Sequence, residues 1–228
     1  KNNMSKIGST GTSSNVITLN YLPQYLVVGR TSTNATIPFA DFTQLNVSVN
    51  GTEIVSLTTN AILNDAFGCS NQVGGNPTES VAVGVATHLP KQAILPLSNG
   101  KIENVNCNLT FTSTTDHGVY ANSETLGTEN YFWSTSTINS LSNNVYSDFR
   151  TLTVPQTSGE LIVNWTNGFS DKFTLDVANE IVALSSGYMS QVALNGTSVT
   201  LYNYGGEIAT AQYFNTDASA SQTVIVNR

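Results

Sequence analysis

One pattern of residues occurs twice in this chain, and it constrains the fold more than any other feature. In the first copy, apolar residues recur at every second position across Leu45–Val49 and lead into Asn50-Gly51. In the second copy, the same spacing across Leu161–Trp165 leads into Asn167-Gly168. The two Asn-Gly pairs are 117 residues apart, close to half of the 228-residue chain. This is the signature of a tandem duplication, so we expect two similar structural halves.

Each copy predicts the same run of elements. Apolar residues at period two are typical of a strand with one buried face. Asn-Gly is favoured in two-residue hairpin turns, because both residues tolerate positive φ. We therefore expect a strand, a two-residue turn and a second short strand in each half. Apolar residues at helical spacing then predict one short helix in each half, over Thr59–Phe67 and over Asp176–Leu184.

The composition favours strands and turns over helices. Asn, Thr and Ser together make up more than a third of the residues, while charged residues make up only 10%, against about 25% in ordinary soluble domains. Thr suits a pleated strand, and Asn and Ser suit turns. We predict an all-β chain of two tandem jelly-roll β-sandwiches, a double jelly roll. Two immunoglobulin-like sandwiches are the alternative, although these usually lack such a helix and carry a Cys–Trp–Cys arrangement that is missing here.

The chain is expected to have three parts. Residues 1–15 are small and polar, so we expect a flexible N-terminal arm there. Residues 16–127 are expected to form the first jelly roll, and residues 128–228 the second.

Catalytic and metal-binding patterns are missing from the sequence. His88 and His117 lie apart from other metal-ligating residues, and each is expected in a polar loop. The sequence contains no nucleophile elbow and no phosphate-binding loop, although a glycosidase can draw its two carboxylates from distant strands. We therefore expect no enzyme and no cofactor. Asp-rich and Asn-rich loops leave structural calcium open, without an EF-hand pattern to support it.

Charge and cysteine usage restrict the partners. The net charge is −7 and only eight residues are Lys or Arg, which argues against direct binding of nucleic acid. No apolar run approaches the roughly 18 residues of a membrane-spanning helix, and the first fifteen residues lack the apolar segment of a signal peptide. Cys69 and Cys107 are expected to be buried free thiols.

The repeated order of strand, Asn-Gly hairpin, short strand and helix is carried by Leu45–Phe67 and Leu161–Leu184. It resembles the double jelly-roll major capsid proteins of tailless icosahedral phages with an internal membrane, of the corticovirus and small flavobacterial phage type. The similarity covers about a fifth of the chain and is structural in kind. A chain of 228 residues is short for this family, which implies small outer loops.

The resemblance implies a structural protein of the virion shell that is made in the host cytoplasm. It implies a homotrimer whose six jelly rolls form a pseudo-hexagon and contact neighbouring capsomers, penton proteins and minor capsid proteins. It places the N-terminal arm inward, where Lys1 and Lys6 would meet anionic headgroups of the inner membrane vesicle. Free thiols agree with synthesis in a reducing cytosol.

A secreted adhesin or carbohydrate-binding tandem β-sandwich is the alternative function. Its composition would be similar, so only the repeat and the placement of the helices favour the capsid protein. Sugar-binding aromatic residues would then be Trp133, Trp165 and the loop Tyr202–Gly206. We expect instead that both tryptophans lie in strands and fill the core.

Overall fold

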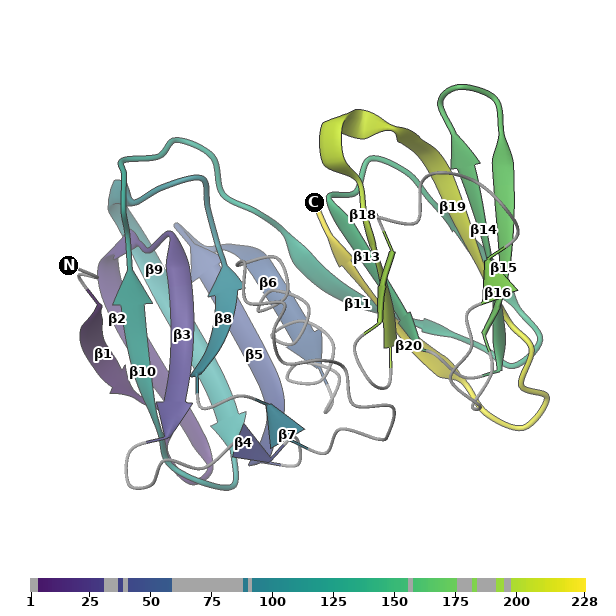
Figure 1. Cartoon of the computed structure of the whole chain (residues 1–228). Coiled ribbons are helices and arrows are strands. Elements are labelled where there is room, and N and C mark those ends of the chain that lie inside the picture. Colours follow the sequence, from purple (N-terminus) through teal and green to yellow (C-terminus); the bar gives the residue numbers. More distant parts are fainter. Residues whose placement is uncertain are drawn as a thin grey trace. The chain divides into compact units, whose positions relative to one another are not determined.

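The computed structural model of this chain contains two compact units (Figure 1). Unit 1 comprises residues 1–79 and 86–134, and unit 2 comprises residues 80–85 and 135–228. The division falls after residue 134, whereas the sequence analysis placed the boundary between residues 127 and 128. The structure describes residues 4–30, 37–38, 41–58, 88–89, 92–155, 158–175, 182–183, 192–194 and 198–228.

Unit 1 is built from two antiparallel sheets. One sheet has the strand order β1-β10-β3-β8, and the other has the order β2-β9-β5-β6. A separate ladder joins β4 and β7. The bounds are β1 (Ser5–Ser9), β2 (Ser14–Leu22), β3 (Tyr25–Arg30), β4 (Ile37–Pro38), β5 (Phe42–Val49), β6 (Thr52–Thr58), β7 (His88–Leu89), β8 (Gln92–Pro96), β9 (Ile102–Ser113) and β10 (His117–Asn122).

Unit 2 repeats this plan. One sheet has the order β11-β20-β13-β18-β17, and the other has the order β12-β19-β14-β15-β16. β11 begins in unit 1, where Trp133 pairs in parallel with Val55 of β6. The bounds are β11 (Trp133–Ile138), β12 (Asn143–Tyr146), β13 (Thr151–Pro155), β14 (Gly159–Trp165), β15 (Ser170–Leu175), β16 (Val182–Ala183), β17 (Val192–Leu194), β18 (Ser198–Tyr202), the 3-10 turn η4 (Tyr204–Gly206), β19 (Ile208–Asn215) and β20 (Gln222–Asn227).

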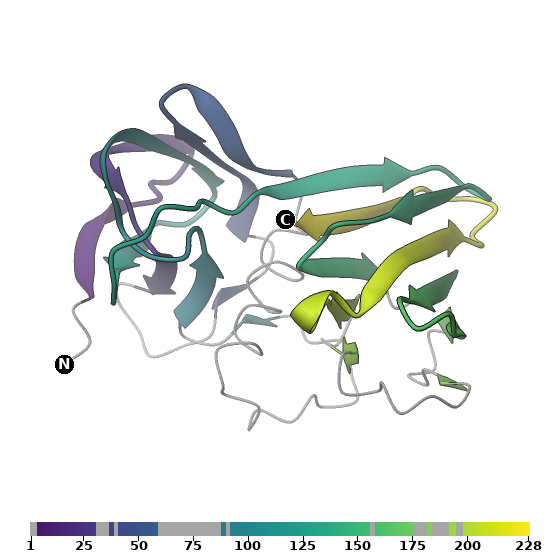
Figure 2. The ribbon, with the colours of Figure 1, turned by 90° about the horizontal axis from the view of Figure 1, so that it is seen from above.

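The two units have the same strand topology. When the eight principal described strands of each unit are numbered along the chain, one sheet has the order 1-8-3-6 and the other has the order 2-7-4-5 in both units. Two four-stranded sheets connected in this way form a jelly roll. The repeat found in the sequence falls on equivalent strands, because β5 and β14 are the fourth strands and β6 and β15 the fifth (Figure 1 and Figure 2). The predicted double jelly roll is confirmed.

The two Asn-Gly hairpins close differently. Asn50 and Gly51 have φ values of 50° and 84°, and Val49 pairs with Thr52, so this turn has the two predicted residues. In the second hairpin only Gly168 has positive φ, 91°. Its N–H donates to the carbonyl of Trp165, 3.1 Å away, and the N–H of Trp165 donates to Phe169. The prediction of a two-residue turn is therefore wrong there, because the turn spans residues 166–168.

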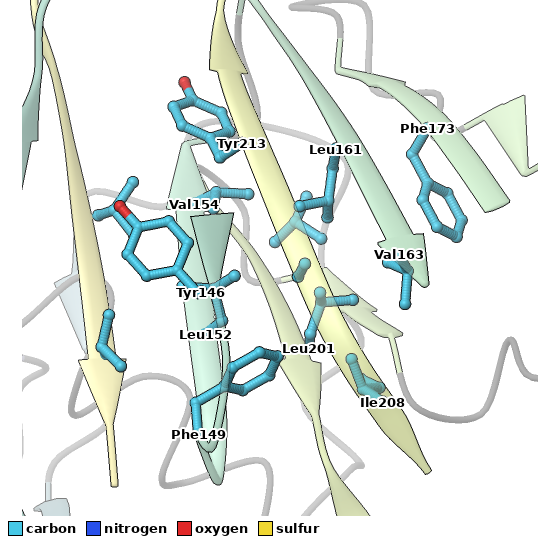
Figure 3. Packing of buried hydrophobic residues seen from close by; sticks show 14 of the residues in the cluster. Tyr146, Phe149, Leu152, Val154, Leu161, Val163, Phe173, Leu201, Ile208 and Tyr213 are labelled. Atoms are coloured by element: carbon cyan, nitrogen blue, oxygen red, sulfur yellow. The ribbon is translucent and has the colours of Figure 1, made fainter. Parts of the chain in front are cut away.

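The alternation of apolar and polar residues along the strands places the apolar side chains in the cores. In unit 2, residues from the two facing sheets interdigitate (Figure 3). The first sheet contributes Leu152, Val154 and Leu201, and the second contributes Leu161, Val163 and Tyr213. Trp165 is 3% exposed and its Nε1 donates to Asp171 Oδ2 at 2.8 Å. Trp133 is also 3% exposed. Both tryptophans are core residues, as expected, and neither forms an exposed aromatic platform.

In the segment 1–15, which was expected to be a flexible arm, the described residues 4–15 do not form such an arm. Ser5–Ser9 form β1, which pairs along its length with β10. Thr10, the next residue, is fully buried, and its Oγ1 donates to the carbonyl of Thr115 at 3.0 Å and accepts the N–H of His117 at 3.0 Å. The expectation rested on the shortage of apolar side chains, whereas this segment is held by backbone pairing and by one buried hydroxyl.

The expected helices have different outcomes. Thr59–Phe67 lies outside the described residues. In Asp176–Leu184, the described residues Val182 and Ala183 form β16, which pairs with Phe173 and Thr174 of β15. The helix prediction is therefore wrong at its C-terminal end, because β15 offers unpaired backbone groups that these apolar residues cover as a strand.

Candidate assembly surfaces

The described residues contain no group of three or more His, Cys, Asp and Glu side chains that would hold a metal ion. Among the helices of these residues, none is long and apolar enough to span a membrane. A shallow depression on unit 1 is lined by neutral side chains of β2 and β9, among them Thr18, Asn104 and Asn106.

His117 is not the polar loop residue that the sequence suggested. It is the first residue of β10 and its side chain is fully buried. Its Nε2 lies 2.8 Å from Asp41 Oδ2, and its ring stacks on Phe42 with 5.1 Å between the centroids. The Nδ1 atom is buried without a hydrogen-bond partner. These contacts make His117 a structural residue of the core. His88 lies in β7, and its side chain is outside the described residues.

Cys107 lies in β9 and is a fully buried free thiol, as expected. Burial raises the pKa of this thiol to about 12, because the apolar surroundings disfavour the thiolate. Cys69 lies outside the described residues.

The outer face of the β2-β9-β5-β6 sheet consists mainly of neutral polar residues, with Glu53 as an exposed charged residue at the end of the row that contains Thr18 and Asn108. One cross-strand row runs from Val16 through Thr110 and Asn46 to Ser56. Beside it, the Thr18 hydroxyl donates to Asn108 Oδ1 at 2.9 Å. Val16, which is 56% exposed, is the apolar member of its row. The high Thr, Ser and Asn content thus has a place in the fold, since every second residue of these strands faces outward.

The equivalent face of unit 2, on the β12-β19-β14-β15 sheet, has a different character. Val145 of β12 is 62% exposed and pairs with Gln212, which pairs in turn with Ile162 of β14. Phe214 pairs with Asn143 in the neighbouring row, and both Ile162 and Phe214 are half-buried. We call Val145, Ile162 and Phe214 the apolar patch of unit 2. Glu160 and Lys172 form a 3.1 Å ion pair at its border.

One of the two lysines predicted to contact a membrane, Lys6, lies on the outer face of the β1-β10-β3-β8 sheet. Lys6 is exposed on the edge strand β1 and pairs with Tyr120, which pairs with Val27 and then Ile94. Lys1 lies outside the described residues. Sequence reasoning named Lys6 but missed its strand, because a single lysine gives no periodic signal.

Comparisons with known proteins give a structural likeness. No protein-family model and no curated protein matches the sequence. Among solved structures, the major capsid protein P2 from bacteriophage PM2 superposes with a TM-score of 0.52 and 9% identity, over 98% of this chain and 93% of that protein. The STIV MCP superposes with a TM-score of 0.53 and 10% identity, over 98% of this chain and 94% of that one.

A chain from the atomic structure of Sulfolobus Turreted Icosahedral Virus gives a TM-score of 0.52 and 12% identity, over 98% of this chain and 88% of that chain. At such identities the likeness concerns the fold, and it extends over both units rather than one sandwich. This agrees with the strand order derived above, in which each unit is a complete jelly roll. The chain therefore has the double jelly-roll fold of these viral major capsid proteins.

Proposed function

We propose that this chain is a viral major capsid protein that builds the shell of a virion from copies of itself. The observation that carries the proposal is the presence of two complete jelly rolls with identical strand order in one chain. The structural likeness to capsid proteins over 98% of the chain supports it. The proposed role is structural and requires no catalytic residue.

The proposed assembly is a homotrimer that acts as a pseudo-hexamer. Three copies of a chain with two similar units present six similar edges, and a six-edged block tiles a closed shell together with neighbouring capsomers. Penton proteins and minor capsid proteins would complete the shell. The virion is then the proposed location, after synthesis in the host cytoplasm.

The surfaces of the described sheets suit repeated self-contact. A face of Ser, Thr and Asn, such as the row through Thr110 and Asn46, is cheaper to desolvate than a charged face. The apolar patch of unit 2 adds exposed apolar surface on one outer face, with Val145 on the edge strand β12. Burying such surface stabilises a contact by about 25 cal/mol per Å².

Contact with an inner membrane vesicle forms a smaller part of the proposal. Lys6 is exposed on β1, and a lysine beside an anionic lipid surface contributes about 1 kcal/mol. Lys1 would add a second positive charge. Binding to vesicles that contain anionic lipid should therefore weaken in Lys6→Gln and persist in Lys101→Gln, whose lysine already pairs with Glu103.

Native mass spectrometry of the purified full chain, with negative-stain imaging of the same sample, tests the main proposal. The expected species is a trimer with a six-cornered outline. A monomer at every concentration that binds oligosaccharides would contradict it and favour the carbohydrate-binding alternative. A monomer without a glycan ligand would also count against self-assembly.

A further inference from the structure

The segment that connects the two jelly rolls is hydrogen-bonded to another loop of unit 1. It runs from the end of β10 at Asn122 to the start of β11 at Trp133, and it passes beside the loop between β8 and β9 (Figure 1 and Figure 2). We call residues 123–132 the connector and residues 97–101 the clasp loop. All of these residues belong to unit 1.

Backbone hydrogen bonds join the two segments in both directions. The clasp loop donates from Asn99 N to the carbonyl of Glu129 and from Lys101 N to that of Thr125, at 2.9 and 2.7 Å. The connector donates back from Gly127 N to the carbonyl of Lys101 and from Tyr131 N to that of Leu97, at 2.9 and 2.8 Å. These bonds make two isolated bridges of opposite sense, an antiparallel one between Ser98 and Asn130 and a parallel one between Lys101 and Leu126.

Side chains add further hydrogen bonds that hold the connector in place. Asn99 Oδ1 accepts the N–H groups of Thr128 and Glu129, both at 3.0 Å. At the start of the connector, Gln24 Oε1 accepts the N–H of Glu124 at 2.8 Å. At its end, Trp133 Nε1 donates to the carbonyl of Pro96 at 2.9 Å. The connector is therefore fixed at both ends and in the middle.

Two glycines allow the segments to approach this closely. A Cβ atom on Gly127 would lie 2.4 Å from the backbone N of Gly100, and one on Gly100 would lie 2.6 Å from the backbone C of Leu126. Neither glycine has the positive φ that would by itself require glycine. Gly100 and Gly127 are thus required for space, because any side chain would push two backbones apart.

We infer that the connector is a rigid segment, held against the clasp loop by the contacts described above, and not a flexible linker. We call these contacts the lock. The lock fixes the path by which the chain leaves the first jelly roll. A free linker of this length with Gly, Ser and Thr would sample many conformations. Here the path is set as far as Trp133, so every copy of the chain enters its second jelly roll from the same point. The consequence for assembly rests on the proposed function: a trimer with six similar edges needs that point to be the same in all three copies.

Hydrogen exchange on the full-length wild-type chain tests the lock directly. The amides of Asn99, Lys101, Gly127 and Tyr131 should exchange at least about a hundredfold more slowly than in an unstructured peptide. Glu-specific protease should cut after Glu124 and Glu129 at least about a hundredfold more slowly in the folded chain than in a synthetic peptide of residues 120–134. Exchange close to the peptide rate, or cleavage of the folded chain as fast as that of the peptide, would overturn the inference.

Two variants test what the lock does. Gly127→Ala should raise cleavage after Glu129 by tenfold or more and weaken trimer formation at least tenfold. Asn99→Ala adds no atoms and removes the acceptor of two N–H groups, so it should have the same effect to a smaller degree even if Gly127→Ala fails to fold. Asn20→Ala, at an exposed position of β2, is the matched control and should change neither measurement.

The two proposals fail separately. If the variants free the connector while trimers form as in the wild type, the positioning role is wrong. If the wild type is monomeric at all concentrations, the proposed function is wrong, and the lock is then judged by exchange and proteolysis alone.

Discussion

His117 Nε2 lies 2.8 Å from Asp41 Oδ2, and this contact joins the first residue of β10 to the residue that precedes β5. The histidine is fully buried and the carboxylate is 13% exposed. The carbonyl of Asp41 also accepts the N–H of Thr114 at 2.7 Å. The contact therefore ties together the two sheets of the first jelly roll, because β10 and β5 belong to different sheets.

Replacing this histidine should destabilise unit 1. His117→Ala should lower the free energy of unfolding by about 2–4 kcal/mol, because it leaves a cavity against Phe42 and an unpaired carboxylate. Urea unfolding followed by circular dichroism measures the loss. Asp41→Asn is the matched control: its side-chain oxygen can still accept from Nε2, so it should cost less than Asp41→Ala. An unchanged midpoint in His117→Ala would contradict the structural role.

The two hairpin turns provide a matched pair of substitutions. Asn50→Ala should destabilise by about 1–2 kcal/mol, because Asn50 has a φ of 50° and its Oδ1 accepts the N–H of Asn106 at 2.9 Å. Asn167→Ala should cost less than about 1 kcal/mol, because only Gly168 of that pair has positive φ. Equal losses of unfolding free energy in the two variants would show that the turns do not differ as described.

Cys107 should be unreactive in the folded chain. Because burial raises its pKa to about 12, the thiol stays protonated at pH 8, and the thiolate that attacks alkylating reagents is scarce. Iodoacetamide at pH 8 should leave Cys107 unmodified in the native protein and modify it fully in urea, as peptide mass spectrometry would show. Burial of the protonated thiol contributes to the free energy of unfolding at neutral pH, which lies below the pKa of this thiol in the unfolded chain. That contribution is lost as the pH rises towards 12, the pKa in the folded chain. Rapid native labelling of Cys107 would contradict its burial.

The sequence predicted the parts of the fold that depend on local periodicity. β5 and β14 were found because Leu45, Val47, Leu161 and Val163 alternate toward the core. β1 was missed because Ser5–Ser9 has no such alternation and is held by pairing with β10, more than a hundred residues away along the chain. A local pattern contains no information on a partner at that distance.

The same reason explains the misplaced site residues. His117 meets Asp41 across a separation of 76 residues, so nothing beside His117 in the sequence indicates burial. The lock between Gly100 and Gly127 was missed because glycine in a loop is ordinary, and only the backbone approach shows that these two glycines are needed. The scarcity of charge on the outer sheet faces, in contrast, follows from composition once the strands are known, whereas the apolar patch of unit 2 does not.

The apolar patch of unit 2 leads to the last prediction, which concerns self-association. Val145 is 62% exposed, Phe214 lies on the neighbouring strand β19, and Ile162 lies on β14, beyond Gln212 in the row of Val145. In the proposed trimer this patch contacts a second copy, so Val145→Asp should place a carboxylate in a desolvated apolar contact and raise the trimer dissociation constant at least tenfold, or about 1.4 kcal/mol. Sedimentation velocity over a range of concentrations measures the change.

Val16→Asp is the matched control, because Val16 holds a comparable exposed place on the neutral polar face of unit 1 and should leave the constant within about threefold. Both variants should keep the wild-type circular dichroism spectrum, since each side chain faces away from its core. If Val16→Asp dissociates the trimer and Val145→Asp does not, the copies meet through the polar face, and the assignment of the contact to unit 2 is wrong.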